Sequence, residues 1–312
     1  MNIIVDKNGM GDFDTVQAAI DAAKPGDVIT VKNGIYKERI ELTKNGVTIE
    51  GEDASKTVIT EGYYALMTME DGQKRGTFRS YTALFNADDI TVRNITIENS
   101  AGFGKVVGQA VAVYAEGDNL KFENCRMLGH QDTLFTGPLP LKENKPGGFT
   151  GPTQDAERRL CRQYYERCYI CGEVDFIFGS AAAYFYDCEL YALDRGQEIN
   201  AYYTAPSTYE NMKYGYVFEN CRFTGNCPKG TAMLSRPWRE HAKAVFIRCD
   251  MDENVSEEGF SRWNGQDAGN TFYAEYECCG AGYTPDKRAP FAHTLSKEEA
   301  EAYTRDKVLS QE

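Results

Sequence analysis

Two stretches of the chain match position for position, and this match restricts the fold more than any other feature. The first covers residues 125–135 (CRMLGHQDTLF) and the second covers residues 168–178 (CYICGEVDFIF). If the chain is a stack of similar coils, the match places two carboxylates, Asp132 and Asp175, one above the other on one outer face. Paired carboxylates of this kind are typical of an acid/base or a nucleophile/acid pair.

A wider repeat surrounds these two stretches. Successive cysteines that follow an aromatic residue by three positions lie 43, 20, 33 and 28 residues apart, so the shortest gap defines a coil of about twenty residues. β-Branched and aromatic residues dominate each unit, which predicts short strands. The alternation in ITVRNITIE (90–98) changes phase within the run, which indicates a corner or a bulge. The pairs are Phe122/Cys125, Tyr165/Cys168, Phe185/Cys188, Phe218/Cys221 and Phe246/Cys249.

These features predict an all-β parallel β-helix, a solenoid in which each coil buries its inner face against its neighbours. A short helix is expected over residues 14–23, because four small or apolar residues share one helical face before Pro25. A second, polar helix is expected over 296–309, with a capping box formed by Ser296 and Glu299 at its start. Both helices are expected to cap the ends of the solenoid.

Composition excludes several classes of partner. The repeat continues without a linker, so residues 1–312 are expected to form a single domain, and a capped solenoid is expected to be a monomer. With 47 acidic against 34 basic residues and a net charge of −13, neither nucleic acid nor an anionic membrane is an expected partner. The first residues lack the pattern of a leader, which predicts a cytoplasmic location; secretion with the leader removed is the alternative.

Ten cysteines invite a redox or metal interpretation, above all at Cys168 and Cys171. Residues three apart on a strand point to opposite faces, so these two thiols cannot easily bind one ion. We interpret the recurrent cysteines as small buried side chains of an internal ladder, which fits a reducing compartment. No metal site is predicted.

Residues 137–159 lie between the two matching stretches and differ in character. Prolines, glycines and charges predict an irregular loop beside the two carboxylates. This loop is either a wall or partial lid of the site or a tolerated surface insertion.

A third signal is LSRPW at 234–238, which contains both Arg236 and Trp238. An arginine beside a buried aspartate keeps that aspartate ionised and oriented through a bidentate contact. A tryptophan offers a flat apolar surface for a sugar ring. The triplet alone is more often structural, but beside two stacked aspartates it predicts part of a site.

The chain resembles the pectin methylesterase family. The segments GQAVAVYAEGD (108–118), GHQDTLF (129–135), RQYYERCYICGEVDFIFG (162–179) and LSRPW (234–238) follow the order and nearly the wording of the four signature blocks of that family. Further similarity runs from IVDKNGMGDFDTVQAAIDAA at the start to LSKEEAEAYT near the end, so it covers essentially the whole chain. The resemblance implies a right-handed parallel β-helix and hydrolysis of methyl esters on galacturonate in pectin or methylated oligogalacturonides.

The resemblance also implies roles for individual residues. Asp175 is the expected nucleophile, and Asp132 is the expected general acid and then base. Gln109 and Gln131 are expected to stabilise the oxyanion, while Arg236 orients Asp175. No metal or organic cofactor is expected. The sugar-binding surface is expected from Trp238, Phe135, Phe178 and Trp263.

Two positions depart from the family pattern: His130 stands where a tyrosine is usual, and Ser235 where a glycine is usual. We interpret His130 as a packed or solvated side chain. Two carboxylates at an interstrand distance of about 4.8 Å cannot both ionise easily, so one pKa is expected to rise while Arg236 lowers the pKa of the other.

Three alternatives use the same architecture. A polygalacturonase would cut the glycosidic bond between aspartates set further apart. A pectate lyase would need a calcium site of clustered carboxylates. A non-catalytic solenoid would only bind carbohydrate. If the chain is an esterase of the cytoplasm, methylated oligogalacturonides are a more plausible substrate than polymeric pectin, which crosses membranes poorly.

Overall fold

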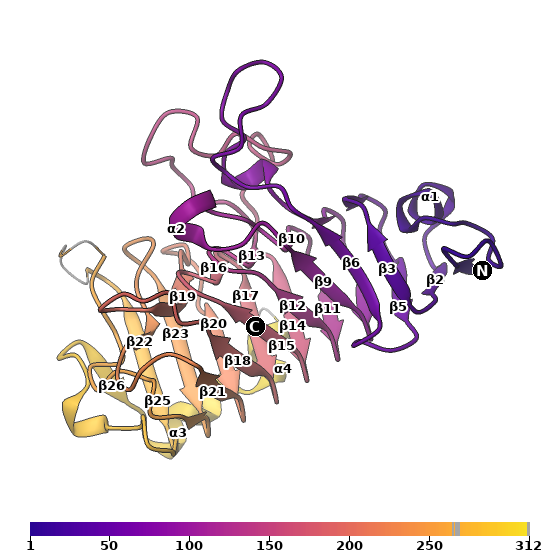
Figure 1. Ribbon diagram of the computed structural model, residues 1–312. Helices are drawn as coiled ribbons and strands as arrows, with labels where there is room; N and C mark the ends of the chain where they lie inside the picture. Colours follow the sequence, from indigo (N-terminus) through magenta and orange to yellow (C-terminus); the bar gives the residue numbers. More distant parts are fainter. Residues whose placement is uncertain (264, 266–268, 311–312) are drawn as a thin grey trace.

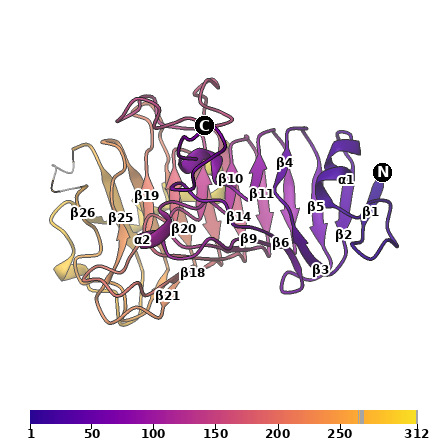
Figure 2. The same cartoon turned by 45° about the horizontal axis from the view of Figure 1, so that its top comes forward.

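The strands of this chain wind into an elongated right-handed parallel β-helix, which confirms the predicted fold class. The computed structural model describes residues 1–263, 265 and 269–310. Within these residues, three parallel sheets contain 11, 8 and 7 strands and are named sheets A, B and C. Each full coil passes from sheet A to sheet B and then to sheet C. Figures 1 and 2 show the coils stacked along one axis, with β2 near the N-terminal end.

Each sheet collects one strand from successive coils. Sheet A contains β1 (Asn2–Val5), β2 (Val28–Val31), β5 (Thr48–Gly51), β8 (Thr91–Arg93), β11 (Leu120–Glu123), β14 (Arg162–Glu166), β17 (Ala182–Tyr186), β20 (Tyr216–Glu219), β23 (Lys243–Ile247), β25 (Phe272–Tyr276) and β26 (Ala292–Thr294). Sheet B contains β3 (Gly34–Lys37), β6 (Thr57–Glu61), β9 (Thr96–Asn99), β12 (Arg126–Leu128), β15 (Tyr169–Gly172), β18 (Glu189–Ala192), β21 (Arg222–Gly225) and β24 (Asp250–Met251). Sheet C contains β4 (Ile40–Leu42), β7 (Ala83–Phe85), β10 (Val113–Ala115), β13 (Leu134–Thr136), β16 (Ile177–Gly179), β19 (Ala201–Pro206) and β22 (Ala232–Ser235).

A residue in the left-handed conformation marks the corner from sheet A to sheet B in successive coils. Asn94 lies between β8 and β9 with φ 56°, and this corner explains the change of phase in residues 90–98. In the following coils the corner residue directly precedes the recurrent cysteine, whose side chain is buried. These corner residues are Asn124, Arg167, Asp187, Asn220, Arg248 and Glu277.

Stacked aromatic rings run through the interior beside the cysteines. Neighbouring rings are 4.5–5.2 Å apart between centroids, and their planes differ by 4–14°. The recurrent cysteines are free thiols buried in the same core, so the predicted ladder is confirmed. Cys168 belongs to this core, whereas Cys171 does not. The stacked rings belong to Phe122, Tyr165, Phe185, Phe218 and Phe246.

The N-terminal helix α1 (Val16–Ala22) lies within the range expected from the sequence. The side chain of Thr15 caps it by accepting a hydrogen bond from the Ala18 amide at 3.3 Å. Its apolar face, with Val16, Ala19 and Ile20, is buried at the N-terminal end of the solenoid.

The C-terminal helix differs from the expected single cap over 296–309. The chain forms α3 (Lys297–Ala300), the 3₁₀ helix η3 (Glu301–Tyr303) and α4 (Arg305–Ser310), and the expected capping box is present at the start of α3. Figure 1 shows α4 beside the middle of the molecule, next to β14, rather than at its end.

The reason for this placement is an apolar patch on the outer face of sheet A. Tyr164 and Tyr184 belong to a buried cluster on β14 and β17, and Val308 of α4 packs into it. The C-terminal helix therefore covers one side of the solenoid, because the outer face of these strands is too apolar to face water.

The remaining helices are α2 (Gly104–Val107) and the 3₁₀ helices η1 (Thr77–Arg79) and η2 (Pro285–Lys287). None of the helices in the described part of the chain has the length and apolar character needed to cross a bilayer.

The aromatic stack makes a stability prediction. Phe185 is fully buried and stacks on rings above and below it, so Phe185→Ala should lower the free energy of unfolding by about 3–5 kcal/mol. Ile35→Ala is the control, because Ile35 is 55% exposed and its truncation should change stability by less than about 0.5 kcal/mol. Chemical denaturation measures both values, and equal losses in the two variants would contradict the role of the stack.

Candidate active site

Strand register brings the two aspartates together. Phe135 of β13 pairs with Phe178 of β16. Asp132 and Asp175 each lie three residues before these phenylalanines, so they lie side by side in adjacent coils. The Asp132 amide donates a hydrogen bond to the carbonyl oxygen of Val174 at 3.1 Å. Both aspartates have left-handed backbones, with φ 63° and 51°. Aspartate adopts this conformation more readily than most residues, and the same conformation recurs at the coil corners, so it marks a repeated turn that both coils share.

Arg236 reaches Asp175 from the end of β22. Its Nε donates to Oδ1 and its Nη2 donates to Oδ2 of Asp175, each at 2.7 Å. The guanidinium also lies 4.0 Å from the ring centre of Tyr202 and 4.3 Å from that of Trp263. The bidentate contact predicted from the sequence is therefore present, and two aromatic rings hold the arginine in place.

The two carboxyls have different proton affinities. Burial and the neighbouring charge of Asp175 raise the pKa of Asp132 well above its ordinary value, and Arg236 offsets only part of this rise. Burial also raises the pKa of Asp175, although the charge and hydrogen bonds of Arg236 oppose the rise. The expectation that Arg236 holds the pKa of Asp175 below its usual range was wrong, because Asp175 is only 7% exposed. Asp132 nevertheless has the larger rise, so it keeps its proton to a higher pH than Asp175 does.

Gln109 and Gln131 line the same cleft as the two aspartates, and the cleft has a volume of about 310 Å³. Gln131 packs against α2, since a Cβ at Gly104 would lie 2.7 Å from the Gln131 Oε1 atom. A cleft of this size accommodates a small-molecule ligand. Both amides thus face the same cleft as the two carboxylates, and a hydrogen bond from Gln131 to Asp132 opposes part of the rise in the Asp132 pKa.

The predicted sugar-binding aromatics separate into two groups. Trp238, Trp263 and Phe178 line the cleft. Phe135 does not: its ring is fully buried, and its centroid lies 5.0 Å from that of Phe178 and 5.1 Å from that of Phe78. The prediction that Phe135 contacts substrate was wrong, because Phe78 of η1 covers it. Phe135 instead supports the floor of the cleft.

His130 has a specific partner that the sequence interpretation missed. Its Nδ1 lies 2.8 Å from Oε1 of Glu173, whose side chain is 1% exposed, and its ring packs against Phe103 at 4.8 Å. The other oxygen of Glu173 accepts a hydrogen bond from the Gly104 amide at 3.1 Å. His130 and Glu173 occupy the same position in the two matching stretches, so the register that stacks the aspartates also stacks this pair.

The loop at 137–159 forms one wall of the cleft. Asn144, Lys145, Gly148 and Phe149 line the cleft from this side. Phe149 packs against Trp238, with 6.3 Å between ring centroids. Figures 1 and 2 show this loop on the same side of the solenoid as α2.

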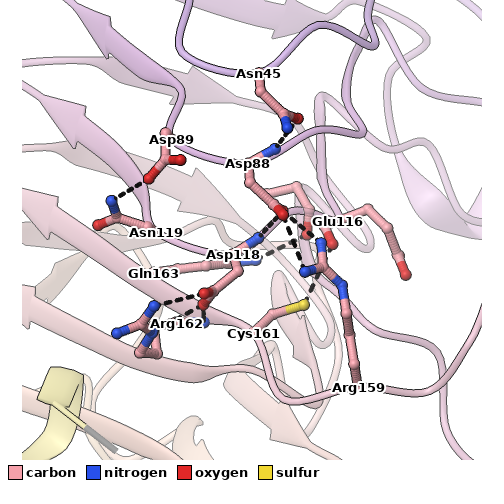
Figure 3. Close-up of polar contacts among 11 residues, drawn as sticks. Asn45, Asp88, Asp89, Glu116, Asp118, Asn119, Arg159, Cys161, Arg162 and Gln163 are labelled. Atoms are coloured by element: carbon pink, nitrogen blue, oxygen red, sulfur yellow. Dashed lines mark hydrogen bonds and ion pairs between the residues drawn. The ribbon is translucent and has the colours of Figure 1, made fainter.

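Charged groups anchor the end of this loop where the chain returns to sheet A, as Figure 3 shows. Arg159 forms an ion pair with Asp88, and Arg162 binds Asp118 through Nε at 2.9 Å and Nη2 at 2.6 Å. Glu116 lies beneath the loop and accepts a hydrogen bond from Thr153 at 3.3 Å. Its side chain is buried, and burial raises its pKa to about 8 even though Arg158 and Thr153 oppose the rise.

Comparison with known proteins identifies the family. The Pectinesterase family model matches residues 2–138 and 154–312, so the chain belongs to the pectinesterase family. Pectinesterase 31 of Arabidopsis thaliana is 33% identical over 95% of this chain and 88% of its own length. Probable pectinesterase/pectinesterase inhibitor 64 of the same plant is 32% identical over 97% of this chain. The chain spans about half of the length of this second relative, 50%.

Solved structures agree with this assignment. Pectin methylesterase PemA from Erwinia chrysanthemi superimposes with a TM-score of 0.81 and 28% identity, covering 98% of this chain and 96% of its own. Pectin methylesterase from carrot superimposes with a TM-score of 0.83 and 28% identity, covering 99% and 93%. A further pectin methylesterase structure, with a TM-score of 0.81, is a complex with a hexasaccharide.

The buried Glu116 makes a prediction about pH and stability. A carboxyl whose pKa is higher in the folded state stabilises the fold below its unfolded pKa, and this contribution is lost as the pH rises through the folded pKa. For Glu116 the window runs from about 4.5 to about 8. Glu116→Gln should therefore match the wild type at the acidic end and become the more stable protein toward pH 8. Urea denaturation across this range tests the prediction, and parallel stability curves would contradict it.

Proposed function

We propose that this chain hydrolyses methyl esters of galacturonate in pectin or methylated oligogalacturonides and releases methanol. The observation that carries the proposal is the bidentate contact of Arg236 with Asp175 beside the buried Asp132, which binds its proton more tightly. This arrangement supplies an oriented nucleophile and a proton donor at one cleft. Membership in the pectinesterase family supports the same reaction.

In the first half of the reaction, ionised Asp175 attacks the carbonyl carbon of the methyl ester. A carboxylate oxygen forms a bond to that carbon, and negative charge develops on the carbonyl oxygen. The side-chain amides of Gln109 and Gln131 donate hydrogen bonds to this oxygen. The bond to the methoxy group then breaks, and protonated Asp132 gives its proton to the leaving oxygen, so methanol departs and an acyl-enzyme remains.

In the second half, Asp132 is a carboxylate and acts as a base. It takes a proton from a water molecule, whose oxygen attacks the same carbonyl carbon. The bond to Asp175 breaks, and Asp175 leaves as a carboxylate. The product is the free acid of galacturonate, and both aspartates return to their starting protonation states.

Arg236 is a positioning residue in this scheme. Its two hydrogen bonds hold the plane of the Asp175 carboxylate, and its charge opposes the rise of the Asp175 pKa that burial causes. Trp238, Trp263 and Phe178 offer apolar surface along the cleft for the sugar rings.

Substrate length and location stay predictions of this account. The free thiols of the buried cysteine ladder fit a reducing compartment and thus a cytoplasmic enzyme that acts on oligogalacturonides. Secretion of a chain whose leader has been removed is the alternative, and it fits an enzyme that acts on polymeric pectin. The expected monomer likewise stays a prediction.

A methanol assay with Asp175→Asn tests the reaction, the substrate and the nucleophile together. On methylated oligogalacturonides the wild type should release methanol without new reducing ends, and Asp175→Asn should lose at least about 10³-fold in kcat because no carboxylate can attack. Asp187→Asn is the matched control: Asp187 also has a left-handed backbone, but it is exposed and does not belong to the residues that line the cleft.

Other products would favour one of the alternatives. New reducing ends without methanol would indicate a polygalacturonase, and activity lost with a chelator would indicate a lyase. Full activity in Asp175→Asn would contradict the assigned nucleophile. Repeating the wild-type assay on polymeric pectin compares the two substrate sizes.

A further inference from the structure

Glu173 is a buried carboxyl that takes no part in the proposed reaction. Its side chain is 1% exposed, and both of its oxygens have partners. Oε1 lies 2.8 Å from Nδ1 of His130, and Oε2 accepts a hydrogen bond from the Gly104 amide at 3.1 Å. Burying a carboxyl is costly unless its oxygens are bound in this way. The second contact ties the coil that follows β15 to α2, 69 residues earlier in the chain.

His130 adds another contact to the same segment. Its ring packs against that of Phe103, with 4.8 Å between the ring centroids, and Phe103 directly precedes Gly104 at the start of α2. The Glu173 amide donates a hydrogen bond to the carbonyl oxygen of His130 at 2.7 Å, which keeps the two residues side by side. α2 has only four residues, and no side chain of its own caps its start. Two side chains from adjacent coils therefore hold its first turn in place.

α2 in turn restricts the side chain of Gln131. An added Cβ at Gly104 would lie 2.6 Å from the Cβ atom of Gln131 and 2.7 Å from its Oε1 atom, so the two residues are in close contact. The amide oxygen of Gln131 therefore faces α2. A hydrogen bond from Gln131 to Asp132 places the amide nitrogen on the side of the carboxyls. The contact with α2 thus keeps the N–H groups of this amide directed at the cleft.

The other end of α2 leads to Gln109. Gly108 ends the helix with a φ of 75°, and its amide donates a hydrogen bond to the carbonyl oxygen of Gly104 at 2.8 Å. Gln109 follows directly. The Ala110 amide then donates to the carbonyl oxygen of Gln131 at 3.0 Å. Both amides assigned to the oxyanion therefore adjoin α2, one through side-chain packing and the other through the chain itself.

We propose that Glu173, together with His130, is a positioning residue for the two amides that stabilise the oxyanion. Glu173 is not among the described residues that line the cleft, so it acts through α2. The inference rests on the proposed function, because the oxyanion forms only when an ester reacts. A displaced amide stabilises the transition state poorly, whereas the aromatic surface of the cleft still binds the sugar rings. Loss of Glu173 therefore lowers kcat and leaves KM nearly unchanged.

Glu173→Ala tests this role on a methylated hexagalacturonide. It should lower kcat by about 10- to 100-fold, since both amides lose their support. Glu173→Gln keeps an oxygen that accepts from the Gly104 amide, so it should recover most of the lost kcat. Glu275→Ala is the matched control: Glu275 is also a buried carboxyl, its partner is Arg288 at 2.8 Å, and it is not among the described residues that line the cleft. This control should keep the wild-type kcat, and an equal loss of kcat in it would overturn the proposal.

Gly104→Ala tests the same contact without removing the buried carboxyl. The residues of α2 do not belong to the described hydrophobic core clusters, so this variant should fold even if Glu173→Ala does not. The added Cβ displaces either α2 or Gln131, and kcat should again fall while KM stays nearly unchanged. Gly62→Ala is the control, because a Cβ there would make only an ordinary contact, 3.5 Å from Oγ of Ser100.

The side-chain amide signals of Gln131 in nuclear magnetic resonance spectra separate this inference from the proposed reaction. Their absence from Gln131→Ala assigns them, and they report the position of the amide without any turnover. They should shift in Glu173→Ala and Gly104→Ala but not in Glu275→Ala. Unchanged signals in the first two variants, or a wild-type kcat in them, would overturn the positioning role. Absence of methanol release by the wild type with the shifts intact would overturn the esterase proposal alone.

Discussion

The ion pair between Arg236 and Asp175 is the interaction on which the rest of the site depends. A carboxylate that is only 7% exposed would otherwise be too poorly solvated to ionise readily. The guanidinium lies between Tyr202 and Trp263 and contributes two hydrogen bonds of 2.7 Å, which keeps one anion available inside an apolar surrounding. Burial raises the pKa of Asp132 and that anion raises it further, so a nucleophile and an acid coexist in adjacent coils.

The solenoid makes this geometry reproducible. Parallel strands of sheet C stack in register, so corresponding residues of successive coils lie next to each other on the outer face. The left-handed corners and the stacked rings recur from coil to coil although the loops differ in length, so an aspartate in one coil meets its counterpart in the next. The left-handed backbones of Asp132 and Asp175 recur because the same turn precedes β13 and β16. The coils differ most in the loops that leave sheets B and C, such as residues 62–82 and the wall at 137–159.

The pairing of the two aspartates was predictable from residue spacing, because equal spacing in two stacked coils places corresponding residues side by side. The match of residues 125–135 with 168–178 predicted that Asp132 and Asp175 would meet. The same match would have paired His130 with Glu173, had it been applied to every position. Contacts that depend on distant loops were not predictable: Phe78 covers Phe135, although nothing near either residue indicates it. The pKa of Asp175 also depends on burial by many coils, which no local motif reveals.

Direct observation of the two protonation states tests this account most closely. Infrared difference spectra at neutral pH, wild type against Asp132→Asn, should show the loss of a protonated carboxyl band. The spectra of wild type against Asp175→Asn should instead show the loss of an ionised carboxylate band. Loss of the same kind of band in both variants would contradict the division of the pair into an acid and a nucleophile.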